Sequence, residues 1–390
     1  MAVTLAYLNE ILQKDYLPGF IAQLNEEASY FYKLMEKNTS PAMGSEETFL
    51  VTFGRSGGIG NRTEGGDVPQ PNSAGRKQIS VSPKNFYARI ALSDRIIKSS
   101  KTGASFISAL DQEMNEILRD SKDSLNRQMF GDGRGVLATV KTAGTTTSSI
   151  TVNDPKFLAT NQVVDIIATA TGNAVVKSNA MITSVDEDTG VITLDSTTTV
   201  AVGDMIVTAG AWNLEVTGLE KIMSKDNTLY GIDRNVNKWF NPAIIDLSSK
   251  TINDNYMEEA IQKVDLKSGS KPDIILSGYQ AYRALKNYLS TFQRYMEIET
   301  RYDAGHKTLS YDGIPVERDK YQNDTTMDLL KMDSFTLLSI GELFSYMNLD
   351  GNIMKAVSGK AQYEAILTSY AEIMCKSPRS NLRIKNIVVS

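Results

Sequence analysis

The sequence lacks most of the residues on which disulfides, metal sites and common catalytic groups depend. Its 390 residues include one cysteine and one histidine. The lone Cys375 excludes an intrachain disulfide, and its apolar run, which begins at Ala371, predicts a small buried hydrophobic side chain. A Ser-His-Asp triad or a histidine-based metal site would depend on His306 alone. His306 follows Ala304 and Gly305, and we expect it to be a solvated loop residue.

A strong charge of one sign and long apolar runs are also lacking. The formal net charge is −5, with acidic and basic residues well mixed, which argues against sequence-specific nucleic-acid binding. No run reaches ~18 apolar residues, and the N-terminus has no basic region followed by an apolar core, so we expect neither a membrane span nor a secretory signal. We expect a chain that stays in a reducing, soluble compartment. The 41% of hydrophobic residues predicts a sizeable core in about two or three domains.

Recognisable ligand-binding motifs are missing as well. The glycine-rich stretch 54–75 contains neither of the common phosphate-binding patterns. Residues 186–190 resemble the start of a calcium loop, but position twelve is Thr197 instead of glutamate, which favours a plain β-turn over an adventitious cation site. Adjacent carboxylates such as Glu258 and Glu259 do not face each other on a helix. We therefore predict no catalytic, cofactor-binding or metal-binding residue.

One long amphipathic helix is predicted for residues 103–130. Its apolar face recurs at helical spacing: Phe106, Leu110, Met114, Ile117, Ser121, Leu125 and Met129. Its opposite, charged face carries Asp111, Glu116, Lys122, Asp123 and Arg127. Gly131 and Gly133 end the run. At ~1.5 Å per residue the helix is about 40 Å long, and its single apolar stripe predicts packing on an extended sheet.

A long hairpin is predicted for residues 46–92, with strands at 46–53 and 79–92 and a glycine- and proline-rich tip between them. Ordering ~45 residues costs on the order of 45–90 kcal/mol at ~1–2 kcal/mol each, and a two-stranded hairpin is marginal alone. We therefore expect a neighbouring subunit to support it. The charged residues of the tip are candidates for ion pairs with that subunit, the alternative being a solvated mobile loop: Arg55, Arg62, Glu64, Asp67, Arg76 and Lys77.

The rest of the chain reads as an arm, a β-rich insert and a mixed region. Residues 5–37 predict two short helices separated at Pro18. Residues 137–213 are rich in threonine, valine, serine and alanine and predict a compact all-β insert. The other predicted helices and strands are helices 256–266 and 279–292 and strands 181–185, 191–194, 202–207, 273–276, 314–318, 363–375 and 382–389. The aromatic residues Tyr282, Tyr288, Phe292, Tyr295 and Tyr302 favour a packed or interface helix over stacking on nucleic-acid bases.

This order of parts resembles the tailed-bacteriophage major capsid proteins of the Hong Kong 97 type, an α+β fold. Six motifs carry the resemblance: Leu92–Ile97; Phe130–Leu137; Thr228–Arg234 with Lys238–Pro242; Pro272–Leu276 with Tyr279–Tyr282; Tyr311–Val316 with Asp319; and Ser377–Ile384. It implies an N-terminal arm (1–43), an E-loop hairpin (44–92), a P domain with a spine helix (93–136), an inserted β domain (137–213), a P-domain segment (214–250), an A domain (251–354) and closing P-domain strands (355–390).

The resemblance also implies a function. It implies a virion shell subunit, made in the host bacterial cytoplasm, that assembles as hexamers and pentamers around double-stranded DNA. Because the arm starts at once, a separate scaffolding protein or a chain already processed is implied, and a portal is a further expected partner. The resemblance implies a procapsid that later expands. Lysines such as Lys77 and asparagines such as Asn381 are present, but no local pattern supports a covalent lysine–asparagine crosslink. Alternatives are an encapsulin-like nanocompartment shell and, in another class, a β-rich surface adhesin or carbohydrate-active protein.

Overall fold

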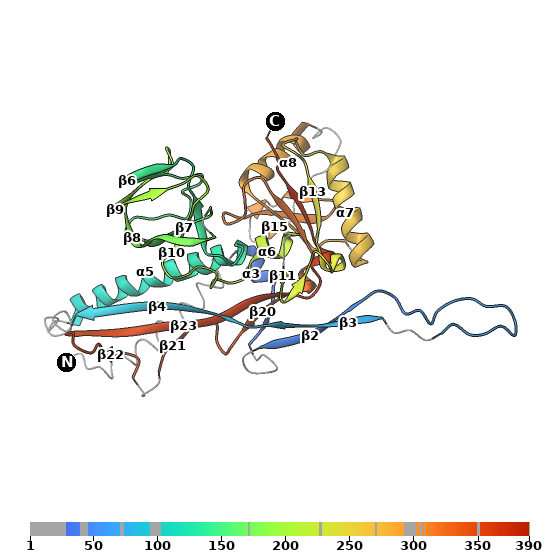
Figure 1. The fold of residues 1–390 in the computed structure, drawn as a ribbon, viewed down its shortest axis with the longest axis horizontal. Coiled ribbons are helices and arrows are strands. Elements are labelled where there is room, and N and C mark those ends of the chain that lie inside the picture. Colours follow the sequence, from blue (N-terminus) through green and yellow to red (C-terminus); the bar gives the residue numbers. More distant parts are fainter. Residues whose placement is uncertain are drawn as a thin grey trace. The chain divides into compact units, whose positions relative to one another are not determined.

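The computed structural model describes residues 29–39, 46–70, 74–93, 103–170, 172–225, 228–269, 271–291, 302–303, 306–307, 309–348 and 352–389 (Figure 1). The chain divides into two compact units. The first unit joins Met1–Phe130 to Glu220–Ser390, and the second is Gly131–Leu219. The predicted helices of the arm before residue 29 lie outside the described residues.

The first sheet of the larger unit is built around one long strand, β23. Its strands are β1 (Glu36–Asn38), β4 (Lys84–Ser93), β20 (Phe335–Ser339), β21 (Ser345–Tyr346), β22 (Lys355–Ala356) and β23 (Gln362–Cys375). Strand β23 pairs with the whole of β4 and then, towards Cys375, with β20, always antiparallel. Strand β1 adds to β20 in parallel. Cys375 is fully buried, which confirms its predicted place in the core.

The long helix α5 spans Gly103–Phe130, as the periodicity predicts, and packs on β4 (Figure 1). Ser121, Leu125 and Met129 of its predicted apolar face are buried. The predicted charged face is not uniformly solvated, because Lys122 is 9% exposed and Arg127 is 8% exposed. This part of the helix is therefore covered on its charged side as well as on its apolar side.

The arm enters the core through the short helix α3 (Tyr30–Leu34). Ser29 caps this helix by accepting a hydrogen bond from the amide of Phe31. The Phe31 ring is fully buried and lies edge-on to Phe130 and Phe335, with centroid distances of 5.9 and 5.3 Å. Burying a side chain of this size contributes about 1.5–3 kcal/mol. The helix predicted to continue to residue 37 ends at Leu34, and strand β1 follows.

A second six-stranded sheet is covered by two helices, α7 (Asp254–Ser268) and α8 (Tyr279–Thr291). In spatial order its strands are β13 (Ala243–Asp246), β24 (Leu382–Lys385), β19 (Met327–Leu330), β14 (Ile274–Ser277), β18 (Ile314–Arg318) and β17 (Leu309–Tyr311). Asn253 caps α7 through the amide of Tyr256, and Gly269 ends it in the left-handed conformation at φ 77°. Apolar residues of both helices and the sheet form one core.

Strand pairing crosses two of the boundaries expected from the sequence. Strands β13 and β24 lie in ranges assigned to the P domain, yet they pair with each other and, through β19, with strands of the range assigned to the A domain. Conversely, β20 falls within the expected A-domain range but pairs with β23. The closing segment therefore contributes strands to both large sheets, with β22 and β23 in the first and β24 in the second.

Short elements complete the larger unit. They are α6 (Leu219–Met223), β11 (Thr228–Leu229), β12 (Ile232–Asp233), β15 (Tyr302–Asp303), β16 (His306–Lys307) and the 3-10 helices η2 (Lys238–Phe240), η3 (Met332–Ser334) and η4 (Pro378–Ser380). His306 therefore lies in a two-residue strand paired with β15, and not in a loop. Phe292 and Tyr295 of the aromatic run lie outside the described residues.

The predicted hairpin divides into two separate pairings. Strand β2 (Glu47–Phe53) pairs with β3 (Gly75–Val81) over seven positions, but β4 turns to β23 (Figure 1). The single return strand predicted for 79–92 is therefore wrong. Its break falls at Ser82 and Pro83, and proline has no amide hydrogen for a continuous ladder.

The smaller unit, Gly131–Leu219, holds its own sheet. In spatial order the strands are β5 (Val136–Thr139), β10 (Met205–Thr208), β7 (Val163–Ala168), β8 (Ala174–Asp186), β9 (Val191–Val200) and β6 (Gly144–Thr151). A bridge between Val140 and Val152 joins the two ends of this order, so the sheet closes on itself. Fourteen fully or almost fully buried apolar residues fill it.

The predicted β-turn at 186–190 is present in this unit. The Gly190 amide donates to the Asp186 carbonyl at 2.9 Å. The Asp186 carboxylate accepts from the amides of Asp188 and Thr189, and the hydrogen bonds from Thr189 come first among the causes that lower its pKa. Both of these hydrogen bonds are accepted by Oδ1 of Asp186, as expected for a β-turn.

Candidate assembly surfaces

The hairpin formed by β2, β3 and the tip between them exposes large apolar side chains. Between the two strands, the described residues 54–70 form no helix or strand. Ile59 is 86% exposed and Val68 is 81% exposed, while Leu50 on β2 is 66% exposed. Large apolar side chains gathered on one projecting element are typical of a protein-contact surface.

The six charged candidates for subunit contact all lie on this hairpin. Five are exposed and the sixth, Lys77, is partly buried. Arg62 donates from Nε to the carbonyl of Asp67 at 3.1 Å and from Nη1 to the carbonyl of Asn61 at 3.0 Å. Among the residues the structure describes, none of the six forms an ion pair. Their pairing with another subunit stays a prediction. Of the six side chains, only that of Arg62 forms a hydrogen bond with the described residues of the tip, to the carbonyls of Asn61 and Asp67.

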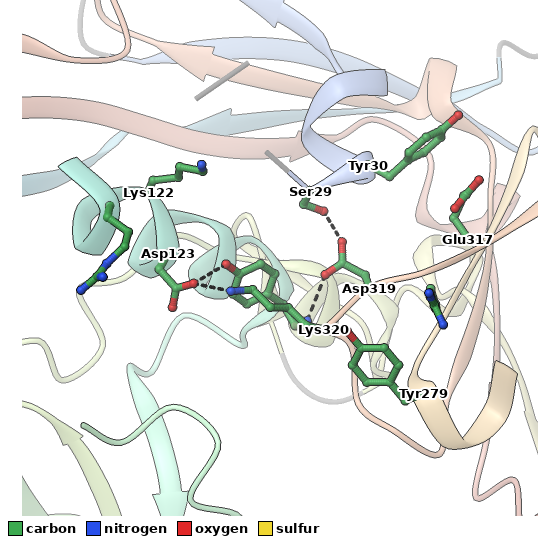
Figure 2. A pocket seen from close by; sticks show the side chains of 11 residues that line it. Ser29, Tyr30, Lys122, Asp123, Tyr279, Glu317, Asp319 and Lys320 are labelled. Atoms are coloured by element: carbon green, nitrogen blue, oxygen red, sulfur yellow. Dashed lines mark hydrogen bonds and ion pairs between the residues drawn. The ribbon is translucent and has the colours of Figure 1, made fainter. Parts of the chain in front are cut away.

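A polar seam joins three segments that are distant in sequence, and Figure 2 shows Ser29, Asp123, Asp319 and Lys320 of it. It is defined here as Ser29, Asp123, Asn126, Asp319, Lys320 and Tyr321. Ser29 Oγ donates to Asp319 at 2.5 Å, and the Ser29 amide donates to Asn126 Oδ1 at 3.3 Å. Lys320 and Tyr321 both donate to Asp123 Oδ1, at 2.5 and 2.6 Å. The seam thus ties the arm, the spine helix and the loop after β18 together.

Electrostatics support this seam. Burial would raise the pKa of Asp123, but the hydrogen bonds and charge of Lys320 and the hydroxyl of Tyr321 outweigh it, and the pKa lies below its usual value. Burial, and then the Asp123 carboxylate, raise the pKa of Tyr321, so its hydroxyl remains a donor. An open pocket of about 480 Å³ lies beside the seam. Sequence reasoning missed the seam because its members look like ordinary surface residues of separate segments.

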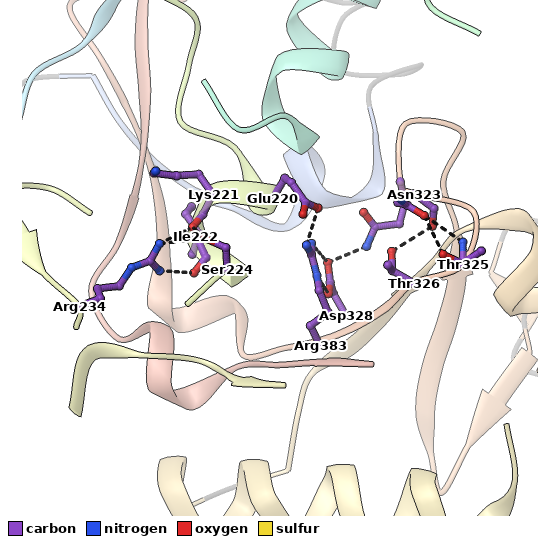
Figure 3. Close-up of polar contacts among 11 residues, drawn as sticks. Glu220, Lys221, Ile222, Ser224, Arg234, Asn323, Thr325, Thr326, Asp328 and Arg383 are labelled. Atoms are coloured by element: carbon purple, nitrogen blue, oxygen red, sulfur yellow. Dashed lines mark hydrogen bonds and ion pairs between the residues drawn. The ribbon is translucent and has the colours of Figure 1, made fainter. Parts of the chain in front are cut away.

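A second polar cluster lies inside the larger unit (Figure 3). Arg383 is 3% exposed and donates to both oxygens of Asp328, at 2.7 and 2.8 Å, and also pairs with Glu220. Gln322 donates to the same Asp328 at 2.6 Å. Nearby, Arg234 is fully buried and donates to the carbonyls at the end of α6. Removing one partner of such a buried pair typically costs 3–5 kcal/mol.

Three further findings concern the described residues only. No helix among them is long and apolar enough to cross a membrane. No group of three or more histidine, cysteine, aspartate or glutamate side chains among them could hold a metal ion. Asn381 is fully buried, and its side-chain amide donates to the carbonyl of Ser377 and to the hydroxyl of Ser334.

The chain is similar to known proteins in structure but not in sequence. No family model and no curated protein matches the sequence. Among solved structures, the capsid asymmetric unit of Cyanophage A-1(L) superposes with a TM-score of 0.57 at 11% identity, covering 90% of each chain. An encapsulin complex from Synechococcus elongatus gives 0.47 at 9% identity, covering 94% of this chain and 90% of that one. Mycobacterium phage Ogopogo gives 0.45 at 9% identity, covering 92% of each.

The chain therefore has the fold of a phage capsid subunit. The Hong Kong 97-type fold predicted from the sequence motifs is confirmed, with a spine helix, an extended hairpin and two large mixed regions. At this level of identity the similarity establishes the fold alone. Any function has to be inferred from the surfaces described above.

Proposed function

We propose that this chain is the major capsid protein of a tailed bacteriophage. It assembles with itself into hexamers and pentamers of an icosahedral shell that encloses double-stranded DNA. Its role is structural and not enzymatic, and it resides in the virion after synthesis in the host bacterial cytoplasm. A scaffolding protein and a portal are its expected partners during assembly.

The observation that carries this proposal is the exposed hairpin. A two-stranded ribbon is marginal in water, and the tip adds Ile59 and Val68 with more than three quarters of their surface in solvent. Ordering such a segment has an entropy cost that its own contacts do not offset. A second copy that covers the tip would supply the missing burial.

The geometry of closure favours a contact between unlike surfaces. In a ring or shell, the hairpin of one subunit meets a different surface of the next, which is a heterologous contact. Arg55, Arg62, Arg76 and Lys77 together with Glu64 and Asp67 give the tip charges of both signs for that surface. Each exposed pair contributes only about 0–1 kcal/mol, but repetition over identical interfaces fixes register.

The charge of the chain suits non-specific enclosure of DNA. The unit Gly131–Leu219 contains nine acidic and four basic residues, a formal charge of −5, which equals that of the whole chain, so the larger unit is formally neutral. A neutral body has no strong attraction for phosphates, and we propose that DNA is confined without specific binding.

Electron microscopy of the purified chain, expressed with and without candidate scaffolding proteins, tests the proposal. We expect closed shells of uniform size, and deletion of residues 54–74 should leave a folded subunit that forms none. Shells that package protein instead of DNA in the infected host would favour a nanocompartment. A monodisperse monomer under all conditions, with affinity for glycans, would contradict a shell role.

A further inference from the structure

An aromatic contact holds the hairpin to the rest of the larger unit at the point where the tip begins. Phe53 is the last residue of β2, and its ring is stacked on that of Trp239, with a centroid distance of 4.5 Å and an angle of 12°. Trp239 belongs to η2 and lies edge-on to Phe240, which is 1% exposed. The stack therefore connects the end of the ribbon to a residue anchored in the core.

Gly75 provides the space for this ring. It is the first residue of β3 and the direct cross-strand partner of Phe53. A Cβ atom at Gly75 would lie 2.5 Å from two atoms of the Phe53 ring, far inside contact distance. The Gly75 backbone is not in the left-handed region, so a side chain is excluded by the ring and not by the backbone conformation.

The stack lies at the tip end of the ribbon, opposite the end that connects to β4. At the other end of the ribbon, Ser82 Oγ donates to Glu46 at 3.1 Å, and the covalent connection to β4 begins. Between these ends, β2 and β3 pair only with each other. A two-stranded ribbon held at one end alone can swing and twist, whereas a second contact at Phe53 fixes its direction.

We propose that Phe53, held between Gly75 and Trp239, is a positioning cluster that sets the direction in which the tip leaves the subunit. The cluster thereby places the contact residues of the tip against the next copy of this chain. This inference rests on the proposed shell function and adds the residues that orient its main contact. Phe53 acts through the tip and is not itself a contact residue.

The direction of the tip can be measured on the unassembled full-length subunit. Spin labels at Asn61→Cys on the tip and Glu258→Cys on α7 report one distance distribution, and buried Cys375 does not compete for label. We expect a narrow distribution in the parent and a distribution at least about twofold broader in Gly75→Ala, because the added methyl group displaces the ring from Trp239. Phe53→Leu should broaden it in the same way.

Tryptophan emission gives a second readout. The chain has two tryptophans, and a Trp212→Phe background leaves Trp239 as the sole reporter. In Gly75→Ala, we expect emission to shift to longer wavelength and quenching by acrylamide to increase. Phe53→Tyr keeps an aromatic ring against Trp239 and should retain both the narrow distribution and the parent emission, which separates loss of the stack from a general effect of substitution at this position.

Gly60→Ala is the matched control. This glycine lies in the same tip, and a Cβ there would be 3.4 Å from Arg62 Nη1, an ordinary contact. We expect parent values in both readouts. If Gly75→Ala behaves like Gly60→Ala, or if Gly75→Ala broadens the distribution but shells form at the parent rate and size, the proposed cluster is wrong. If the parent forms no shells, the capsid function fails, while the distance measurement still decides whether the stack orients the tip.

Discussion

The unit Gly131–Leu219 and the hairpin β2–β3 are both made of antiparallel strands. They differ in how far each region buries its own apolar side chains. The unit closes its sheet through the Val140–Val152 bridge and buries its own apolar core. The hairpin ends in a tip whose Ile59 and Val68 face solvent. The comparison shows that β-structure in one chain serves both a self-sufficient domain and an element that requires another molecule.

The largest expected difference between the two regions is independent folding. We expect a fragment of residues 131–219 to fold with a single cooperative thermal transition, because its sheet and core are complete within it. A fragment of residues 46–81 should show no cooperative transition, since two strands without a covered face are marginal. Circular dichroism and calorimetry of both fragments measure this. A cooperatively folded hairpin fragment would remove the contrast on which the shell proposal depends.

Core and tip substitutions of similar size should separate the regions quantitatively. Ile192 is fully buried in the smaller unit, and Ile192→Ala should lower its free energy of unfolding by about 2–5 kcal/mol through lost burial and a cavity. Val68→Ala in the tip should change subunit stability by less than about 0.5 kcal/mol. Denaturant unfolding of the unassembled subunit checks both values. Equal effects would mean that the tip is packed within its own subunit.

The sequence predicts an element well where the residues that determine it are close together in the chain. The limits of α5 agree with the 3.6-residue period of residues 103–130, and β18 has the predicted bounds. These elements follow from side chains close together in sequence. The division of the return strand at Pro83 was missed, because the choice of β23 as the partner of β4 depends on residues almost 300 positions away.

The polar clusters were beyond prediction for the same reason. Asp123, Lys320 and Tyr321 meet only after the spine helix and the loop after β18 have packed together. Arg383 and Asp328 are 55 residues apart, and nothing in either segment marks the other as its partner. The six tip residues could be chosen from composition alone, whereas the Phe53–Trp239 stack required the structure.

The polar seam offers an intermediate effect, confined to the larger unit. Because the folded pKa of Asp123 lies below its unfolded value near ~4, the carboxylate contributes stability above that pH and loses it as pH falls through the folded value. We therefore expect Asp123→Asn to flatten the decrease in unfolding free energy of the subunit below about pH 4. Urea unfolding at several pH values, with and without the substitution, measures this. Parallel curves would show that the seam does not hold a stabilising charge.

The smallest expected effect on subunit stability comes from charge reversal in the tip. The same change should affect assembly more strongly, which tests the proposed function of the tip. Arg62→Glu should alter subunit stability by less than about 0.5 kcal/mol, because the side chain is exposed. Its effect on assembly should be larger, since the same change recurs at every interface, and weakest at high salt, where surface charges are screened. Lys141→Glu, an exposed reversal in the smaller unit, is the control. Light scattering during assembly should show Arg62→Glu delayed and Lys141→Glu unaffected, and equal delay in both would mean that net charge, and not the tip, governs association.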